Sequence, residues 1–226
     1  MQKLKILILT TITSFTMLAC KQSPGGDKAK TTEAQEVTTA EADKAMNVDV
    51  SKSILAFIGT KVTAHHAGIV NIKSGKLMAK GTELTGGNFV IDMQTVTVNN
   101  GAPEPDGKLT GHLKSPDFFD VAKYPEAKFE ITGVKPFSGS VVSDNSSDEL
   151  DIYKVSDPNM TINGNLTIKD VTKNIEFPAK VTMNDAGVTA IAKFMVDRKL
   201  WGLNYPGMPD DLIRDEIWFG INLAAN

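Results

Sequence analysis

The stretch HLKSPDFFDVAKYP, which begins at His112, carries the residue types that acid/base chemistry needs. It combines the histidine with two carboxylates, Asp117 and Asp120, and such groups transfer protons when they lie within hydrogen-bond reach of a substrate. The same stretch contains Phe118 and Phe119, which point in different directions when they follow a short turn. We favour a plug over a catalytic site, because Asp117 after a proline suits the cap of a turn and at least one phenylalanine should enter a core. Whether such a plug moves as a lid or packs statically stays open.

His65 and His66 suggest a metal site, but their spacing is unfavourable. Neighbouring residues on a strand point to opposite faces, so both rarely reach one ion. His112 is the third and last histidine, and a zinc site would require it to converge with His66 and a carboxylate. We therefore expect no metal site. One histidine of the pair should pack or face a cavity, and the other should meet water.

Asp197-Arg198 and the nearby Trp201-Gly202 end an expected strand with a charged pair and a large ring. One interpretation is a polar mouth, at which Arg198 or His66 meets the phosphate, carbonyl or carboxylate head of a ligand. The other is a structural corner, in which Arg198 bonds to backbone carbonyls or a nearby acid and Trp201 packs as a knob. The corner is favoured, and both interpretations are retained.

The first twenty residues indicate export. A positively charged start precedes the largely apolar run Ile6–Leu18, whose 13 residues are too few to span a bilayer but are typical of a secretory signal. The run ends at Leu18-Ala19-Cys20, which resembles the lipobox of a bacterial lipoprotein. By that resemblance, residues 1–19 are removed and Cys20 carries the lipid. Because Cys20 is the only cysteine, the mature domain is expected to have no disulfide.

Residues 20–45 are expected to form the lipidated N-terminus and a flexible tether. Lys21–Ala45 contain no aromatic residue and one bulky aliphatic, so they cannot bury enough apolar surface to offset the entropy lost on ordering. As a random coil this segment reaches about 25–30 Å. Lys21 is not the aspartate that commonly signals retention at the inner membrane, which favours the outer membrane of a bacterial envelope. The face of that membrane stays open.

The net charge and the motifs of the chain argue against a nucleic-acid partner and against a phosphate-binding loop. The formal net charge is −3 and no basic run occurs, so a nucleic-acid partner is not expected. The glycine-rich segment Gly101–Leu109 departs from a phosphate-binding loop in spacing and in residue types, so no cofactor is expected from it.

The remaining domain, residues 46–226, is expected to consist of strands, because apolar and polar residues alternate with period two. In Met160–Ile168 the apolar side chains occupy even positions, and Gly164 in that series is expected to face inward and leave room for a neighbour. A parity shift after Asn88–Met93 predicts a bulge near Gln94-Thr95. One helix is expected, from Lys108 to about Phe118.

About eight antiparallel strands with one helical interruption indicate an all-β barrel or sandwich. A barrel of that size is either filled by its own side chains or holds one small ligand, and periodicity alone does not choose between them.

Several phrases in the domain, taken in order, resemble one family. They are Phe57-x-Gly59-x-Lys61, His66-Ala67-Gly68 with Ile72–Gly75, Gly86–Met93, His112–Asp120 with Tyr124-Pro125, Gly164–Lys169 with Val171–Lys173, and Asp197-Arg198-x-x-Trp201-Gly202. As a set spanning about residues 48–224, they are similar to the YceI-like family in its lipoprotein form. Asp170 departs from the family pattern, which often has glycine there, and the polar insertion around Ser138–Asp151 is expected to be a loop.

The resemblance implies an extended, antiparallel, lipocalin-like β-barrel whose interior holds a long apolar molecule, such as a polyisoprenoid, a quinone-type tail or a fatty amide. It also implies a secreted or periplasmic protein, and no catalytic activity is established for the family as a whole. Inward-facing apolar residues of the expected strands, with the aromatic residues of the plug and corner, are the candidates for the cavity wall. They are Phe89, Ile91, Met93, Phe118, Phe119, Phe129, Ile131, Ile162, Leu166, Phe194, Trp201 and Phe219.

Two hypotheses of different class follow. The first is an envelope-anchored binding protein that transports, stores or sequesters such a molecule, with no cofactor apart from a bound isoprenoid-type lipid. The second is an enzyme or redox helper that acts on an isoprenoid lipid through His66, His112 or Arg198. A packed barrel that serves only as a scaffold is a third option. The identity of the ligand and the pairing of two barrels into a homodimer are left open by the sequence.

Overall fold

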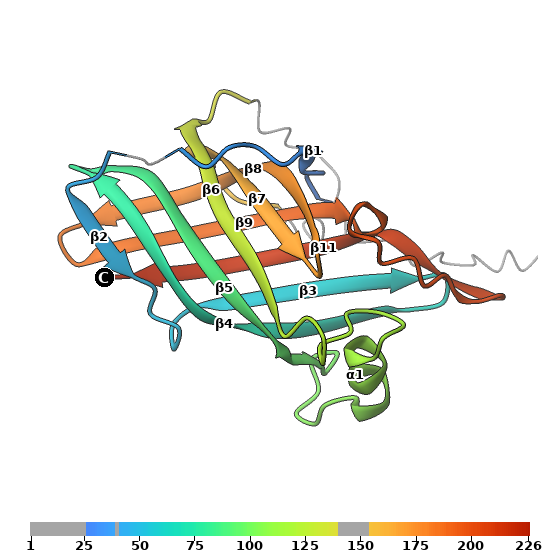
Figure 1. The fold of residues 1–226 in the computed structure, drawn as a ribbon. Helices are drawn as coiled ribbons and strands as arrows, with labels where there is room; N and C mark the ends of the chain where they lie inside the picture. Colours follow the sequence, from blue (N-terminus) through green and yellow to red (C-terminus); the bar gives the residue numbers. More distant parts are fainter. Residues whose placement is uncertain (1–25, 39–40, 140–153) are drawn as a thin grey trace, which may run out of the picture.

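A computed structural model describes residues 26–38, 41–139 and 154–226 of the chain (Figure 1). The expected signal sequence, Cys20 and most of the expected loop around Ser138–Asp151 lie outside the described residues. Within the described ranges, no helix is long and apolar enough to cross a bilayer.

Long strands build the domain, and the described residues also contain one α-helix and one 3-10 helix at the ends of strands. The strands are β1 (Lys30–Glu33), β2 (Lys44–Asn47), β3 (Ile54–Lys61), β4 (His65–Lys80), β5 (Glu83–Val98), β6 (Glu126–Pro136), β7 (Met160–Ile168), β8 (Val171–Asn184), β9 (Gly187–Asp197), β10 (Gly207–Met208) and β11 (Asp211–Ala225). The helices are α1 (Gly107–Lys114) and the 3-10 helix η2 (Arg198–Trp201).

The eight longest strands close into one antiparallel barrel. Each of β3 to β8 pairs with the next strand in the chain, β9 pairs with β11, and β11 pairs back with β3. The barrel is elongated, and α1 lies beside one of its ends (Figure 1). The prediction of an all-β barrel of about eight strands with one short α-helix is confirmed for the described part of the chain.

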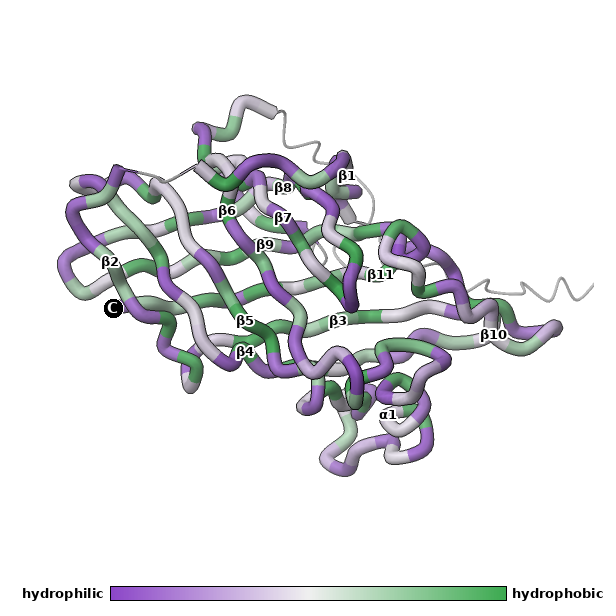
Figure 2. The backbone as a smooth tube through the Cα atoms, in the orientation of Figure 1, coloured by the Kyte–Doolittle hydropathy of each residue, from purple (hydrophilic) through white to green (hydrophobic). Residues whose placement is uncertain are grey.

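Alternating hydropathy explains why these residues form the wall of a barrel. Apolar and polar residues alternate along the strands, as Figure 2 shows in green and purple. In β7, Ile162, Leu166 and Ile168 are buried and lie on one face. Gly164 lies on the same face, and a Cβ there would come within 2.2 Å of the ring of Phe129. The inward position of Gly164 is therefore confirmed, and the ring of Phe129 fills the room that it leaves.

The bulge expected near Gln94-Thr95 is present in β5. The register jumps from the pair Ile69–Thr97 to the pair Asn71–Asp92, so β5 carries extra residues between them. The hydroxyl of Thr95 donates to the carbonyl of Asp92 at 2.7 Å and accepts from the N–H of Asn71 at 2.8 Å. These side-chain bonds replace the ladder bonds that the bulge removes.

The helix is shorter than expected. Asp106 caps α1 by accepting from the N–H of Leu109 at 3.0 Å, and the helix ends at Lys114 rather than near Phe118. It ends there because Ser115 precedes Pro116, and a residue before proline is disfavoured in the helical region. The chain continues in tight turns, in which the N–H of Phe118 donates to the carbonyl of Ser115 at 3.1 Å.

Part of the segment expected to be a tether belongs to the barrel wall. β1 pairs with the first half of β8, and the N–H of Ala29 donates to the carbonyl of Met195 on β9 at 2.9 Å. The backbone of Gln35 then bonds to the side chain of Asn165 in both directions, at 3.0 and 2.7 Å. A flexible tether throughout residues 20–45 is therefore wrong. Open edges of β8 and β9 offer backbone partners, and such pairing needs no large apolar side chains.

Candidate functional site: an apolar cavity inside the barrel

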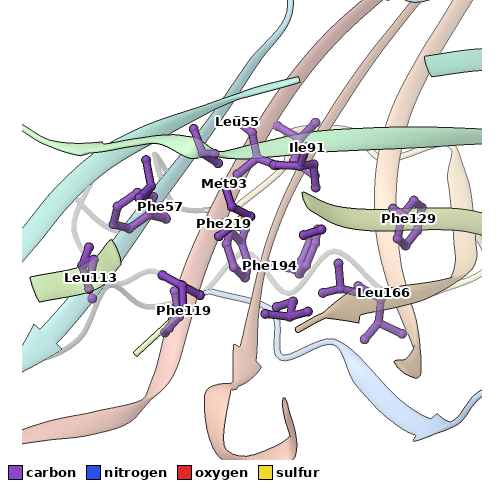
Figure 3. A pocket seen from close by; sticks show the side chains of 18 of the residues that line it. Leu55, Phe57, Ile91, Met93, Leu113, Phe119, Phe129, Leu166, Phe194 and Phe219 are labelled. Carbon is purple, nitrogen blue, oxygen red and sulfur yellow. The ribbon is translucent and has the colours of Figure 1, made fainter. Parts of the chain in front are cut away.

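The interior of the barrel contains a cavity of about 340 Å³. Its wall is made by side chains from all eight barrel strands, from α1 and from the turns after α1. In Figure 3, Phe57, Leu113 and Phe119 lie towards one side of the view and Phe129 and Leu166 towards the other, with Phe194 and Phe219 between them. A wall of this composition offers contact to an apolar molecule along its whole length.

A series of phenylalanine rings crosses the cavity wall. Phe89 stacks on Phe129 at 6.2 Å between ring centroids, and Phe129 lies 5.9 Å from Phe177. Phe177 stacks on Phe194 at 4.1 Å, and Phe194 lies 6.0 Å from Phe219. Five strands therefore contribute to one continuous aromatic surface. Phe129 on β6 and Phe177 on β8 approach each other across β7, on which Gly164 has no side chain.

The structure brings together eleven of the twelve cavity candidates. Those that line the cavity are Phe89, Ile91, Met93, Phe118, Phe119, Phe129, Ile131, Ile162, Leu166, Phe194 and Phe219. Trp201 does not line it, so its assignment to the cavity wall is wrong. Its ring is fully buried and its Nε1–H donates to the carbonyl of Leu166 at 2.9 Å, which ties η2 to β7. Contact of the other eleven with a ligand stays a prediction.

Arg198 forms a structural corner and not a polar mouth. Its side chain is 1 % exposed and does not line the cavity. The guanidinium donates to the carbonyls of Leu203, Ile213 and Arg214 and to the carboxylate of Asp215 at 3.4 Å. Burial lowers the pKa of Arg198, and the charge of Asp215 opposes that shift. Most N–H donors of Arg198 bind backbone carbonyls, because the chain turns here between β9 and β11 and these carbonyls need partners.

His66 lies at one end of the cavity, which we call the mouth. It faces inward on β4 opposite Gly59, whereas His65 points outward and is exposed. Burial lowers the pKa of His66 below its ordinary 6.5, and the positive charge of Lys61 lowers it further. His66 is therefore neutral at pH 7. Its buried Nδ1 has no hydrogen-bond partner within the described residues.

Lys61 and Asp211 also line the mouth and neutralise each other. Their ion pair measures 2.6 Å, and hydrogen bonds from Lys61 and Thr63 lower the pKa of Asp211. The mouth therefore combines the neutral imidazole of His66 with a direct ion pair between Lys61 and Asp211. Such a lining is suited to a neutral polar group at the end of an apolar ligand more than to a free anion.

The segment that begins at His112 acts as a plug beside the mouth. His112 packs edge-on against Tyr205 with ring centroids 4.6 Å apart, and Phe118 packs edge-on against Phe119 at 5.0 Å. The expected shared face of the helix, Leu109 with His112 and Leu113, lines the cavity. Neither Asp117 nor Asp120 lines it, so the structure does not bring these carboxylates to His112 as a site inside the cavity. The described residues contain no group of three His, Cys, Asp or Glu side chains that could hold a metal ion.

Sequence reasoning missed several wall residues, among them Phe57, Phe177 and Tyr205. A signal for Phe177 exists, because Ile175, Phe177, Ala179 and Val181 alternate with polar residues and a proline. Phe57 belongs to one of the motifs that resemble the family. Its inward direction also follows from the period of two, because Leu55 and Phe57 lie on the same face of the strand. Tyr205 lies in a loop, where no periodicity indicates the direction of a side chain.

A family model described as the YceI-like domain matches residues 46–225. The chain belongs to the YceI-like family. Curated YceI proteins from Salmonella arizonae and Salmonella paratyphi B are each 34% identical to it over 95 residues, which cover 42% of this chain and 40% of theirs. The matched part is thus well under half the length of these curated relatives.

Solved structures support the same YceI-like fold. BcnA of Burkholderia cenocepacia has a TM-score of 0.60 at 18% identity, covering 79% of this chain and 99% of that one. A domain from Saccharophagus degradans, described as polyisoprenoid binding and implicated in plant cell wall breakdown, has a TM-score of 0.55 at 13% identity. It covers 80% of this chain and 97% of its own. At sequence identities of 18% and 13%, the similarity shows a shared fold alone.

Proposed function

We propose that this protein binds one long apolar molecule inside its barrel and transports, stores or sequesters it in the bacterial envelope. The observation that carries the proposal is the uninterrupted apolar wall of the cavity. Its ionisable lining residues, Lys61, His66, His112, Tyr205 and Asp211, all lie towards the mouth. The deep part is lined by aliphatic and phenylalanine side chains, so an occupant gains affinity there by burial alone.

A polyisoprenoid, a quinone-like molecule or a fatty amide fits this site. Each methylene group removed from water contributes about 0.8 kcal/mol, so a long tail binds tightly with few polar contacts. The description of the Saccharophagus degradans domain as polyisoprenoid binding supports this ligand class for a related barrel. A neutral head would meet His66 and the closed ion pair of Lys61 with Asp211.

A lipid anchor at Cys20 is the second part of the proposal. The sequence supports it through the short apolar run that ends at Leu18-Ala19-Cys20, and Lys21 favours the outer membrane. Growth with an alkyne-bearing fatty acid should label the wild-type protein and leave the Cys20→Ser variant unlabelled. An unlabelled wild-type protein that is exported and cleaved would refute the anchor while leaving the ligand proposal intact.

A binding role is favoured over catalysis on the geometry of the ionisable groups. Arg198, one of three residues considered for a catalytic role, is committed to backbone carbonyls. His112 packs against Tyr205, and His66 has no carboxylate among its hydrogen-bond partners in the described residues.

Organic extraction of the purified protein tests the ligand proposal. We expect mass spectrometry of the extract to find one lipid species in near-stoichiometric amount. Protein refolded without lipid should then take up a prenylated quinone or a fatty amide added in solution. Absence of lipid in the extract, together with no uptake by refolded protein of native circular dichroism, would refute the proposal.

A further inference from the structure

Two turns at the mouth expose large apolar side chains. Val62 follows β3 and is 56 % exposed, while Met208 and Leu212 belong to the β10–β11 hairpin and are 61 % and 49 % exposed. We call Val62, Met208 and Leu212 the mouth rim. Exposed apolar side chains that gather at one place mark interaction sites more often than chance exposure does.

The two turns form one rigid unit. The N–H of Val62 donates to the carbonyl of Leu212 at 3.2 Å, and Ile213 pairs with Lys61 in the sheet. The carboxylate of Asp211 binds Lys61 at 2.6 Å and accepts from both the N–H and the hydroxyl of Thr63 at 3.0 Å. The apolar side chains of the rim are thus held at fixed positions. The charges of Lys61 and Asp211 beside them are paired, whereas Asp210 at the tip of the hairpin is exposed.

The mouth rim borders the opening of the cavity. Met208 itself lines the cavity, as do Lys61 and Asp211 next to Val62 and Leu212. At the opposite end the lining residues, such as Leu77 and Val181, are buried, so the cavity ends inside the fold. That end also exposes apolar side chains, Val50 and Ile54, but they do not line the cavity.

The chain ahead of β1 is short enough to keep the mouth near a membrane. The backbone of Asp27 and of Ala29 bonds to Met195 on β9, which fixes the start of the described chain to the barrel. Five residues separate Cys20 from Gly26, the first described residue. A chain of that length spans at most about 20 Å. Met195 pairs with Trp218, which is six residues, or about 20 Å of strand, from Leu212. A lipid on Cys20 would therefore hold the mouth within reach of the bilayer surface.

We propose that the mouth rim inserts into the headgroup region of a phospholipid bilayer, so that the apolar ligand passes between bilayer and cavity without crossing water. The inference rests on the proposed function, because it requires an apolar ligand and the anchor at Cys20. Val62 and Leu212 enter the interface from two turns that backbone bonds already join, so docking orders no further segment. The ion pair of Lys61 with Asp211 cancels two charges of this surface, and the exposed carboxylate of Asp210 at the tip of the hairpin disfavours an anionic bilayer, so a zwitterionic bilayer is the expected partner.

The first experiment measures which end of the barrel enters the lipid. Acylation consumes the thiol of Cys20, the only native cysteine, so Val62→Cys and Ile54→Cys each supply one free thiol for an environment-sensitive fluorophore. The mature acylated proteins are reconstituted on phosphatidylcholine vesicles that contain lipids with bromine atoms at a known depth. We expect a blue shift and quenching at position 62 and a water-like signal at position 54. A water-like signal at both positions, or quenching at 54 alone, would overturn the inference.

The second experiment measures ligand transfer with the methyl ester of trans-parinaric acid, a fluorescent fatty acyl compound without charge, as the probe. The double variant Val62→Asp/Leu212→Asp changes rim residues that do not line the cavity, and Ile54→Asp is the matched control at the other end. We expect the rim variant to take up the probe from phosphatidylcholine vesicles at least about tenfold more slowly, because charged side chains resist entry into the interface. Its equilibrium affinity for the probe in solution should be unchanged, and the control should transfer it at the wild-type rate.

The outcomes separate this inference from the proposed function. If the probe binds in solution but the rim variant transfers it at the wild-type rate, docking fails and the binding function stands. If position 62 enters the lipid but no variant binds the probe, the binding function fails. A blue shift at position 62 without vesicles, accompanied by dimers in sedimentation, would assign the rim to a second copy of the chain and overturn the inference.

Discussion

Replacement of Ala192 by phenylalanine tests the cavity directly. Ala192 is buried on β9 and lines the cavity, and its partner on β8 is a second alanine, Ala179. These two small side chains widen the cavity where a ligand tail would pass. The ring in Ala192→Phe would occupy that space.

The expected loss of affinity follows from the ligand atoms that the ring displaces. A phenyl ring takes the place of about four methylene groups, each worth about 0.8 kcal/mol, so the loss is about 3 kcal/mol. That energy corresponds to a factor of about 200 in Kd. If the cavity is real, the ring enters free space and the ligand-free protein keeps its stability. In a filled core the same ring would cost about 1–3 kcal/mol, or several degrees in Tm.

The assay is fluorescence titration of refolded, lipid-free protein with the uncharged methyl ester of trans-parinaric acid, alongside a thermal melt. Ile191→Phe is the matched control, because Ile191 is the neighbouring residue on β9 and is exposed on the outer face. We expect the control to bind as wild type. Wild-type affinity in Ala192→Phe, or a clear fall in its Tm without ligand, would refute the cavity as the binding site.

Three further predictions follow. Arg198→Met should lower the free energy of unfolding in urea by about 2–4 kcal/mol, because buried carbonyls of Leu203 and Ile213 lose their donor. Lys199→Met, which removes an exposed ion pair with the same Asp215, should cost at most about 1 kcal/mol, and equal costs would contradict the corner. Burial lowers the pKa of His66 in the folded protein, so the imidazole of the unfolded chain binds a proton more tightly. The stability that is present above pH 6.5 should therefore be lost as the pH falls towards the lowered pKa. His66→Gln should flatten the Tm profile in this window, and an unchanged profile would count against a buried neutral imidazole. The double variant His66→Gln/His112→Gln should keep its bound lipid on extraction, whereas loss of a measurable turnover with full lipid occupancy would support the enzymatic hypothesis.

The barrel was predictable because its main signal is local. Alternation in Met160–Ile168 predicts both the strand β7 and the inward face on which Gly164 lies. The parity shift after Met93 predicts the bulge, since extra residues reverse the side on which the following side chains lie. These features follow from the period of two and do not depend on which strands become neighbours.

The N-terminal strand β1 was not predictable by the same reasoning. Lys30–Glu33 are exposed or half-buried and carry no apolar pattern, so composition indicates a flexible segment. The strand forms because β8 and β9 pair only through Ala179–Asn184 and separate beyond that point, which leaves open edges. That separation is a property of the closed barrel and is not visible in the segment itself.

The candidate site was predicted where strands supply it. At the corner, the favoured interpretation of Arg198 and Trp201 agrees with the structure, and the placement of Trp201 in the cavity wall does not. A tryptophan near the end of a strand is equally suited to a cavity wall and to a buried knob, and the choice depends on the carbonyl of Leu166 that Trp201 reaches. The position of Arg198 follows in the same way from carbonyls of the distant strand β11. Both outcomes depend on contacts between segments, which spacing along the chain does not contain.

A crystal structure of the protein purified from bacterial membranes, without refolding, tests the central claim most directly. We expect continuous, elongated electron density inside the barrel that passes Phe119 near the mouth and ends beyond Phe129 and Phe194. A barrel interior closed by rearranged side chains, or one that contains only separate water molecules, would contradict the claim that the protein shelters a long apolar ligand.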